Sequence, residues 1–204
     1  VSSTAVTLAL ARNAASGGNP LPLAGAASLA AMVSVLRVCA VILIIEPGVF
    51  ASVAIAAMAA ALAFAVCGAL LMTRDSGNEE RSAIARNPFE LGPLLLFALL
   101  FALVATASAG LAAQFGSRGL LVTSALAGTF DVDVSVLSAL RLVKYSVPVE
   151  TVGQAVLAAL AANAIGRLSL AVFAGPIRFW VPLAGATLTA ATAGYGAMLS
   201  PGPG

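Results

Sequence analysis

The chain has 204 residues, of which 61% are hydrophobic and only 9% are charged, and its mean hydropathy is +1.06. Soluble domains carry about 25% charged residues, so this composition excludes a soluble fold and predicts an all-α, polytopic membrane protein. The net charge of +2 is too small to indicate a nucleic-acid partner, and the absence of histidine removes the commonest general base and transition-metal ligand.

Long apolar runs predict a single transmembrane domain over residues 1–204. A spanning helix needs about 20 largely apolar residues. This rule gives a half-segment over 1–11 and full spans over 21–45, 49–72, 91–115, 120–143, 152–174 and 179–199. The polar stretch 73–88 predicts a cytoplasmic loop. Because the chain starts as if in the second half of a span, we expect it to be a fragment or a processed form.

The positions of arginine and lysine predict how this bundle is oriented. Counting one crossing per span places Arg12, Arg74, Arg81, Arg86, Arg141 and Lys144 on one side, and Arg118 and Arg178 on the other. Basic residues are enriched on the cytoplasmic side of membrane proteins. The first side is therefore predicted to be cytoplasmic, and the C-terminus is predicted to lie there too.

Two pairs of segments indicate an internal repeat. "SSTAVTLALAR" (2–12) aligns with "DVDVSVLSALR" (131–141), so that Ser2 and Thr4 fall on Asp131 and Asp133.

The second pair consists of "VSVLRVCAVILIIEP" (33–47) and "NAIGRLSLAVFAGP" (163–176), which places Arg37 on Arg167. The corresponding segments lie four spans apart, which predicts a parallel repeat whose first copy is truncated. Transporters built from two halves often bind their substrate between the halves, near the bilayer midplane.

Asp131 and Asp133 stand out because a carboxylate at the centre of a membrane helix costs about 2.5–3.5 kcal/mol. They are predicted to form an ion or proton site together with Ser135 and Asn163. Carboxylate and hydroxyl oxygens are hard ligands and suit Mg²⁺ or a similar divalent cation. Under this interpretation Asp131 and Asp133 would be the metal ligands.

The alternative interpretation is that the aspartates form ion pairs that hold helices together, with Arg167 as the obvious partner. Arg37, its counterpart in the repeat, faces a half where the hydroxyls of Ser2, Ser3 and Thr4 replace the carboxylates. Its possible roles are to bind an anionic group, to pair with an acid, or to extend toward the interface. The sequence leaves these readings open.

The stretch "RNPFELGP" (86–93) stands at the predicted cytoplasmic mouth of a span and includes Asn87 and Glu90. Pro88 suits the first turn of a helix, and a glutamate in that turn complements the helix dipole. Helix capping explains this stretch better than a gating role.

Four stretches resemble a bacterial integral-membrane domain of unknown function that is commonly found C-terminal to an MgtC/SapB-type domain. They are "VSSTAVTLALAR", "RNPFEL", "RGLLVTSALAGTFDVDVSVLSALR" and "AANAIGRLSLAVFAG". The most specific part is the Gly-x-x-Asp-Val-Asp block, in which Thr129 and Phe130 depart from the usual Leu-Ala. The resemblance implies a bacterial inner-membrane protein, and the MgtC association suggests cation homeostasis.

The sequence therefore predicts a transporter or channel-like module for a cation, with a divalent cation such as Mg²⁺ as the expected kind. One alternative is a scaffold or regulatory subunit that partners an MgtC-like domain. Another is a proton-coupled transporter of an anionic or organic solute. An enzyme is not expected, because the sequence has no nucleophile–base arrangement and no nucleotide-binding motif. The expected partners are the lipid bilayer and an MgtC/SapB-type domain, no nucleic acid is expected, and a homo-oligomer is left open.

Overall fold

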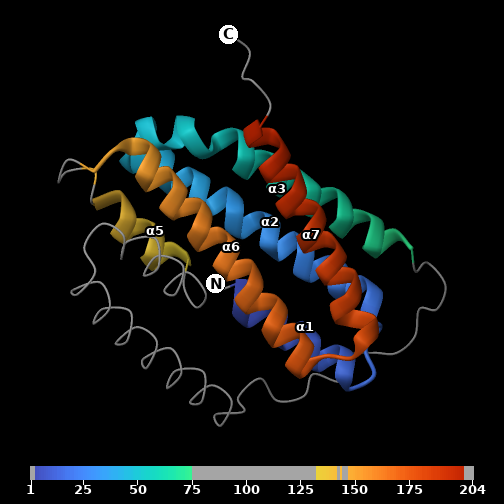
Figure 1. The fold of residues 1–204 in the computed structure, drawn as a ribbon. Helices are drawn as coiled ribbons and strands as arrows, with labels where there is room; N and C mark the ends of the chain where they lie inside the picture. Colours follow the sequence, from blue (N-terminus) through green and yellow to red (C-terminus); the bar gives the residue numbers. More distant parts are fainter. Residues whose placement is uncertain (1–2, 75–131, 142, 144–146, 200–204) are drawn as a thin grey trace.

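The computed structural model describes residues 3–74, 132–141, 143 and 147–199, and every regular element in these ranges is helical (Figure 1). The helices are α1 (Ser3–Ala15), α2 (Pro20–Ile45), α3 (Pro47–Thr73), α5 (Val132–Arg141), α6 (Val149–Ala174) and α7 (Ile177–Leu199). The predicted all-α bundle is confirmed. The predicted span 91–115, most of the span 120–143 and nearly all of the loop 73–88 lie outside the described residues.

Short sequence signals define where the long helices begin. Asn19 caps α2, since its side-chain oxygen accepts a hydrogen bond from the backbone N–H of Leu21 at 3.4 Å. Pro20 and Pro47 stand in the first turns of α2 and α3. Backbone N–H groups in a first turn have no acceptor within the helix, so the missing N–H of proline costs no hydrogen bond there. Gly17 has a φ of 103°, which few other residues adopt, and this allows a tight turn between α1 and α2.

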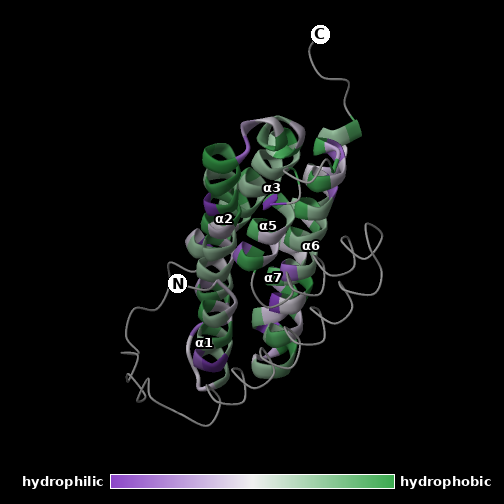
Figure 2. Cartoon of the chain, turned by 90° about the vertical axis from the view of Figure 1, so that its left-hand side faces the viewer, coloured by the Kyte–Doolittle hydropathy of each residue, from purple (hydrophilic) through white to green (hydrophobic). Residues whose placement is uncertain are grey.

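Three of the described helices, α2, α3 and α6, are long and apolar enough to cross a membrane. With 26 or 27 residues each, they extend about 40 Å, more than the ~30 Å hydrocarbon core of a bilayer. Large apolar side chains such as Ile44, Leu62 and Phe173 are exposed, and Figure 2 shows apolar residues along most of the bundle. Lipid can cover such a surface and water cannot. The protein is therefore a membrane protein.

Two hydrophobic clusters show that α2 and α6 run antiparallel. Ala24 and Ala27, near the start of α2, pack in one cluster with Ala171, near the end of α6. Ile42, near the end of α2, packs in another cluster with Val152, near the start of α6. We call the end of the bundle where α2 begins the Pro20 end, and the end where α3 begins the Pro47 end.

The directions of α3 and α7 follow from two close approaches between glycines and neighbouring helices. A Cβ added to Gly25 of α2 would lie 2.8 Å from the carbonyl oxygen of Gly68, so α3 returns to the Pro20 end. A Cβ added to Gly194 of α7 would lie 3.1 Å from the carbonyl oxygen of Ala56, so α7 runs antiparallel to α3. Small residues permit such close packing in membranes.

The two short helices occupy opposite halves of the bundle (Figure 1). α1 runs beside α6 toward the Pro20 end, because Thr4 contacts Asn163 and Ala11 lies close to Gly175. α5 starts beside Arg37 of α2 and runs toward the Pro47 end, where Leu140 joins the cluster at the start of α6.

The predicted parallel direction of the repeat is therefore wrong. α2 and α6 are the helices that the repeat aligns, and they point in opposite directions. The repeat itself stays a prediction, and if α1–α3 corresponds to α5–α7, its two copies are inverted. The parallel direction assumes that each apolar segment crosses the membrane completely. α5, the described part of the segment 120–143, instead starts beside the interior of α2 and covers only one half of the bundle.

The predicted grouping of charges changes for the same reason. Arg12, Arg74 and Arg178 lie at the Pro20 end, whereas Arg141, Glu46 and Glu150 lie at the Pro47 end. The predictions that Arg141 shares a side with Arg12 and that Arg178 lies opposite are both wrong. So is the prediction that α7 ends on the side of Arg12, since α7 runs from the Pro20 end to the Pro47 end.

Chemical labelling can test this topology in membranes. With Cys39 and Cys67 replaced by alanine, a single cysteine is introduced as Arg12→Cys, Arg178→Cys or Glu150→Cys. All three positions are exposed. We expect a membrane-impermeant maleimide to label the first two from one side of sealed vesicles and the third from the other side. Labelling of Arg178→Cys and Glu150→Cys from the same side would contradict the antiparallel arrangement.

Candidate functional site

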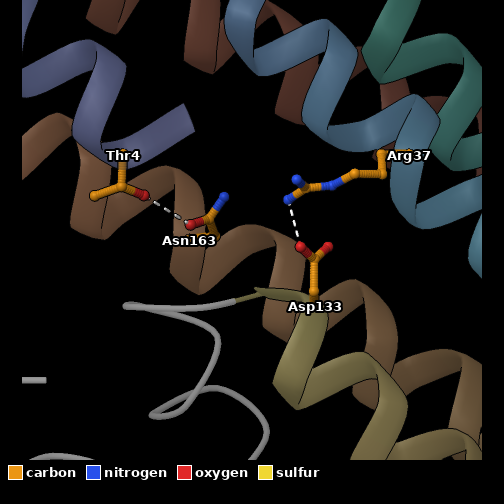
Figure 3. Close-up of polar contacts among 4 residues, drawn as sticks. All are labelled: Thr4, Arg37, Asp133 and Asn163. Carbon is orange, nitrogen blue, oxygen red and sulfur yellow. Dashed lines mark hydrogen bonds and ion pairs between the residues drawn. The ribbon is translucent and has the colours of Figure 1, made fainter. Parts of the chain in front are cut away.

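Polar side chains from four helices meet inside the bundle, where α1 and α5 approach the long helices α6 and α2. Figure 3 shows Thr4, Arg37, Asp133 and Asn163 in this region, one from each helix. Asn163 lies about 21 Å along α6 at ~1.5 Å per residue, close to the middle of that helix. We call these four residues the central polar cluster.

The first contact in the central polar cluster joins α1 to α6. Thr4 Oγ1 donates a hydrogen bond to Asn163 Oδ1 at 3.3 Å, and the two residues are only 2% and 4% exposed. Thr7, one turn further along α1, donates its hydroxyl proton to the carbonyl oxygen of Ser3. Hydrogen bonds between membrane helices average about 0.6 kcal/mol, so the Thr4–Asn163 bond positions the two helices more than it stabilises them.

The second contact joins α2 to α5 and is an ion pair between Arg37 and Asp133 (Figure 3). Their side chains are 39% and 31% exposed. Asp133 lies in the first turn of α5, where a negative charge also complements the helix dipole. The carboxylate is thus stabilised by a guanidinium and by the start of its own helix.

One alternative from the sequence pairs Asp131 or Asp133 with Arg167. In the structure, Asp133 pairs with Arg37. The antiparallel topology is the reason. Arg37 lies in the part of α2 toward the Pro47 end, where α5 packs. Arg167 lies in the part of α6 toward the Pro20 end, where α1 packs.

Arg167 is buried, with 2% exposure. Its guanidinium carbon lies 5.3 Å from the centre of the Phe64 ring. Within the described residues, no hydrogen bond or ion pair involves its side chain, and its buried Nε has no acceptor. A desolvated cation–π contact contributes about 2 kcal/mol, whereas an uncompensated buried charge costs about 3–5 kcal/mol. The contact with Phe64 therefore offsets only part of the cost of burying Arg167.

The remaining predicted residues divide into those that the structure places and those that it does not. Ser3 and Ser135 are buried on α1 and α5. Asp131, Ser2, Asn87 and Glu90 lie outside the described residues. The predicted ligand pair Asp131 and Asp133 is thus only half placed. In the ranges that the structure covers, no three histidine, cysteine or acidic side chains come together to hold a metal ion.

Two interior residues were not predicted from the sequence. Phe64 is one of many apolar residues in its span, and nothing in the local sequence marks it as the neighbour of an arginine. Ser34 is buried on α2, and its hydroxyl oxygen has no hydrogen-bond partner among the described residues. A serine three residues before an intramembrane arginine is a signal that could have identified it.

The Arg37–Asp133 pair predicts a specific pattern of stability changes. Arg37→Gln and Asp133→Asn should each lower the free energy of unfolding in detergent, because each leaves one charge without its partner. The double variant should lose less than the sum of the two, with a coupling energy of about 0.5–3 kcal/mol. Arg178→Gln, far from Asp133 at the Pro20 end, is the control and should add independently to Asp133→Asn. Strict additivity in both combinations would contradict the ion pair.

Comparison with known proteins gives a family and no further relative. Residues 1–175 match the family described as "Domain of unknown function (DUF4010)". No curated protein and no solved structure matches the chain. The match covers most of the sequence, and the chain therefore belongs to the DUF4010 family.

Proposed function

We propose that this domain is a membrane transport module whose solute passes the central polar cluster, and that it is not an enzyme. One observation carries the proposal. Each contact of the central polar cluster joins one of the helices α1–α3 to one of the helices α5–α7, and these two sets run in inverted directions; the contacts are Thr4–Asn163 between α1 and α6, and Arg37–Asp133 between α2 and α5. In transporters with inverted halves, the substrate site lies at this place, between the halves and near the midplane.

The arrangement of the helices supports inverted halves. α1 packs against α6, and α5 packs against α2; α3 also contacts α6, as α7 contacts α2. Each contact of one set thus has a counterpart in the other when α1–α3 is set against α5–α7. Such a pair of halves can exchange conformations and expose a central site first to one side and then to the other.

We further propose that the Pro20 end faces the cytoplasm of a bacterial cell, with the bundle in its inner membrane. Arg12, Arg74 and Arg178 lie at this end, whereas Arg141 lies at the Pro47 end with Glu46 and Glu150. The bias of basic residues toward the cytoplasm supports this orientation. The three arginines also give a partner on that side, such as an MgtC/SapB-type domain, a positively charged surface to contact.

The Mg²⁺ transport predicted from the sequence remains one version of this proposal. Asp133 supplies a carboxylate inside the bundle, and the buried hydroxyl of Ser135 follows on the same helix. A cation that binds Asp133 has to displace Arg37, which occupies the carboxylate in this conformation. Cation binding would then be linked to the opening of an ion pair that joins α2 to α5.

The scaffold alternative has an observation in its favour, because the ion pair and the Thr4–Asn163 hydrogen bond each hold two helices together through polar side chains. A scaffold would keep these contacts closed, whereas a transport module has to open them to water. The two functions therefore differ in whether water reaches the centre of the bundle from both sides.

Accessibility of an introduced cysteine distinguishes the two. In a background without Cys39 and Cys67, Asn163→Cys is treated with a small, charged methanethiosulfonate reagent from each side of sealed vesicles. We expect modification from both sides, because a transport module exposes its centre alternately. Ala159→Cys, one turn away in an apolar cluster and fully buried, is the control and should stay unmodified.

Failure of the reagent to modify Asn163→Cys from either side would favour the scaffold. The same assay tests the Mg²⁺ version. If Mg²⁺ binds Asp133, it should slow modification of Asn163→Cys several-fold, and Asp133→Asn should abolish this protection. Equal protection with and without Asp133→Asn would contradict a cation site at this carboxylate.

A further inference from the structure

We infer that Arg167 is the anchor of a binding site for a small carboxylate, which names the substrate class of the transport module proposed above and rests on that proposal. The first observation is the burial of the guanidinium. Arg167 is 2% exposed on a membrane-spanning helix, and within the described part of the chain its only recorded partner is the Phe64 ring. A buried polar atom without a partner requires an explanation, and an ion is one of the few available.

The predicted repeat supplies the second observation. It aligns Arg37 with Arg167 and Asp133 with Thr4. Arg37 contacts the carboxylate of Asp133 on the neighbouring short helix. In the other half, the short helix carries a threonine at the equivalent position, and Thr4 contacts Asn163, one turn before Arg167. Among the described residues, the second arginine thus has the same kind of neighbourhood but no carboxylate partner.

The residues near Arg167 suit a carboxylate ligand. Asn163 and Arg167 are four residues apart and share one face of α6. α1 and α6 run in the same direction, and Thr4 of α1 contacts Asn163 of α6. Thr7, one turn after Thr4, is therefore at the level of α6 where Arg167 lies, one turn after Asn163. The planar guanidinium binds the two oxygens of a carboxylate in a forked geometry, and the side-chain NH2 group of Asn163 is a further donor on the same face.

The Phe64 ring limits the kind of ligand. It lies over the guanidinium carbon and belongs to an apolar cluster with Ala31, Ala186 and Ala190. The side of the guanidinium that faces the ring is therefore occupied, and a ligand has to approach from another side. The apolar surroundings favour a single negative charge with a short hydrocarbon group over a highly hydrated, multivalent ion such as sulfate.

Binding of acetate by the purified chain in detergent tests the inference. Sodium acetate should raise the melting temperature with a saturable dependence on concentration, and equal sodium chloride should not, because a ligand that binds only the folded state stabilises it. Arg167→Gln should abolish the acetate effect. Arg167→Lys, which keeps the charge but lacks the fork, should weaken apparent affinity at least tenfold. Arg178→Gln, at the bundle end, should bind acetate as the wild type does.

Several results would overturn the site. They are a chloride effect equal to that of acetate, unchanged binding in Arg167→Gln, or binding that appears only in Asp131→Asn, which would make Asp131 the counter-charge of Arg167. If Arg167→Gln does not fold, Arg167→Lys carries the comparison. Acetate binding does not require transport, and access of the reagent to Asn163→Cys does not require acetate. The site and the transport function can therefore fail independently.

Discussion

A guanidinium within a membrane-spanning bundle must be neutralised by groups within its reach, and this constraint organises the interior of the protein. Water and counter-ions are not available in hydrocarbon, and the charge of an arginine cannot be removed by deprotonation at ordinary pH. Arg37 meets the constraint through Asp133, and the pair fixes α5 against α2. Among the described residues, Arg167 meets it only partly, through its contact with the Phe64 ring. The difference between these two arginines is the main chemical asymmetry of the described interior.

The antiparallel arrangement of α2 and α6 explains why the two arginines do not share one carboxylate. Arg37 and Arg167 lie at similar distances from the starts of their helices. Because the helices run in opposite directions, the two arginines lie on opposite sides of the middle of the bundle. Each is then closest to the short helix of the other half. Asp133 of α5 gives Arg37 a charged partner. The equivalent position of α1 is Thr4, which has no charge to offer Arg167.

The sequence predicts the class of fold but not the direction of its halves. Apolar runs and proline positions identify α2, α3 and α6, because the bilayer thickness sets the required length. The relative direction of distant helices depends on the number of crossings between them. Two complete crossings between α3 and α6 would start α6 at the Pro20 end, whereas α6 starts at the Pro47 end. The predicted sides of Arg141 and Arg178 are wrong for the same reason, because both depend on this count. The sequence left open whether an acid pairs with Arg37, and the direction of the helices brings Asp133 to it.

For the candidate site, the sequence likewise predicts which residues are interior but not how they pair. The cost of polar groups in lipid predicted Asp133, Asn163, Arg37 and Arg167 as interior residues, because each is unusual in an apolar run. The pairing among them could not be predicted, since partners more than 90 residues apart are brought together only by the fold. Phe64 could not be predicted at all, because an aromatic ring in an apolar span has no distinguishing neighbours in the sequence.

The charges in the described interior bear on which solute the centre favours. Arg37, Arg167 and Asp133 together give a net charge of +1. A divalent cation about 10 Å from a single positive charge is repelled by about 3 kcal/mol at an effective dielectric constant of about 20. Binding to Asp133 would also release Arg37 from its partner and leave two guanidinium groups to neutralise. A monoanion beside Arg167 has the opposite effect, because it leaves the Arg37–Asp133 pair in place and brings this net charge to zero. On electrostatic grounds the described centre favours an anion, and Mg²⁺ would need Asp131 and Asp133 together to overcome the arginines.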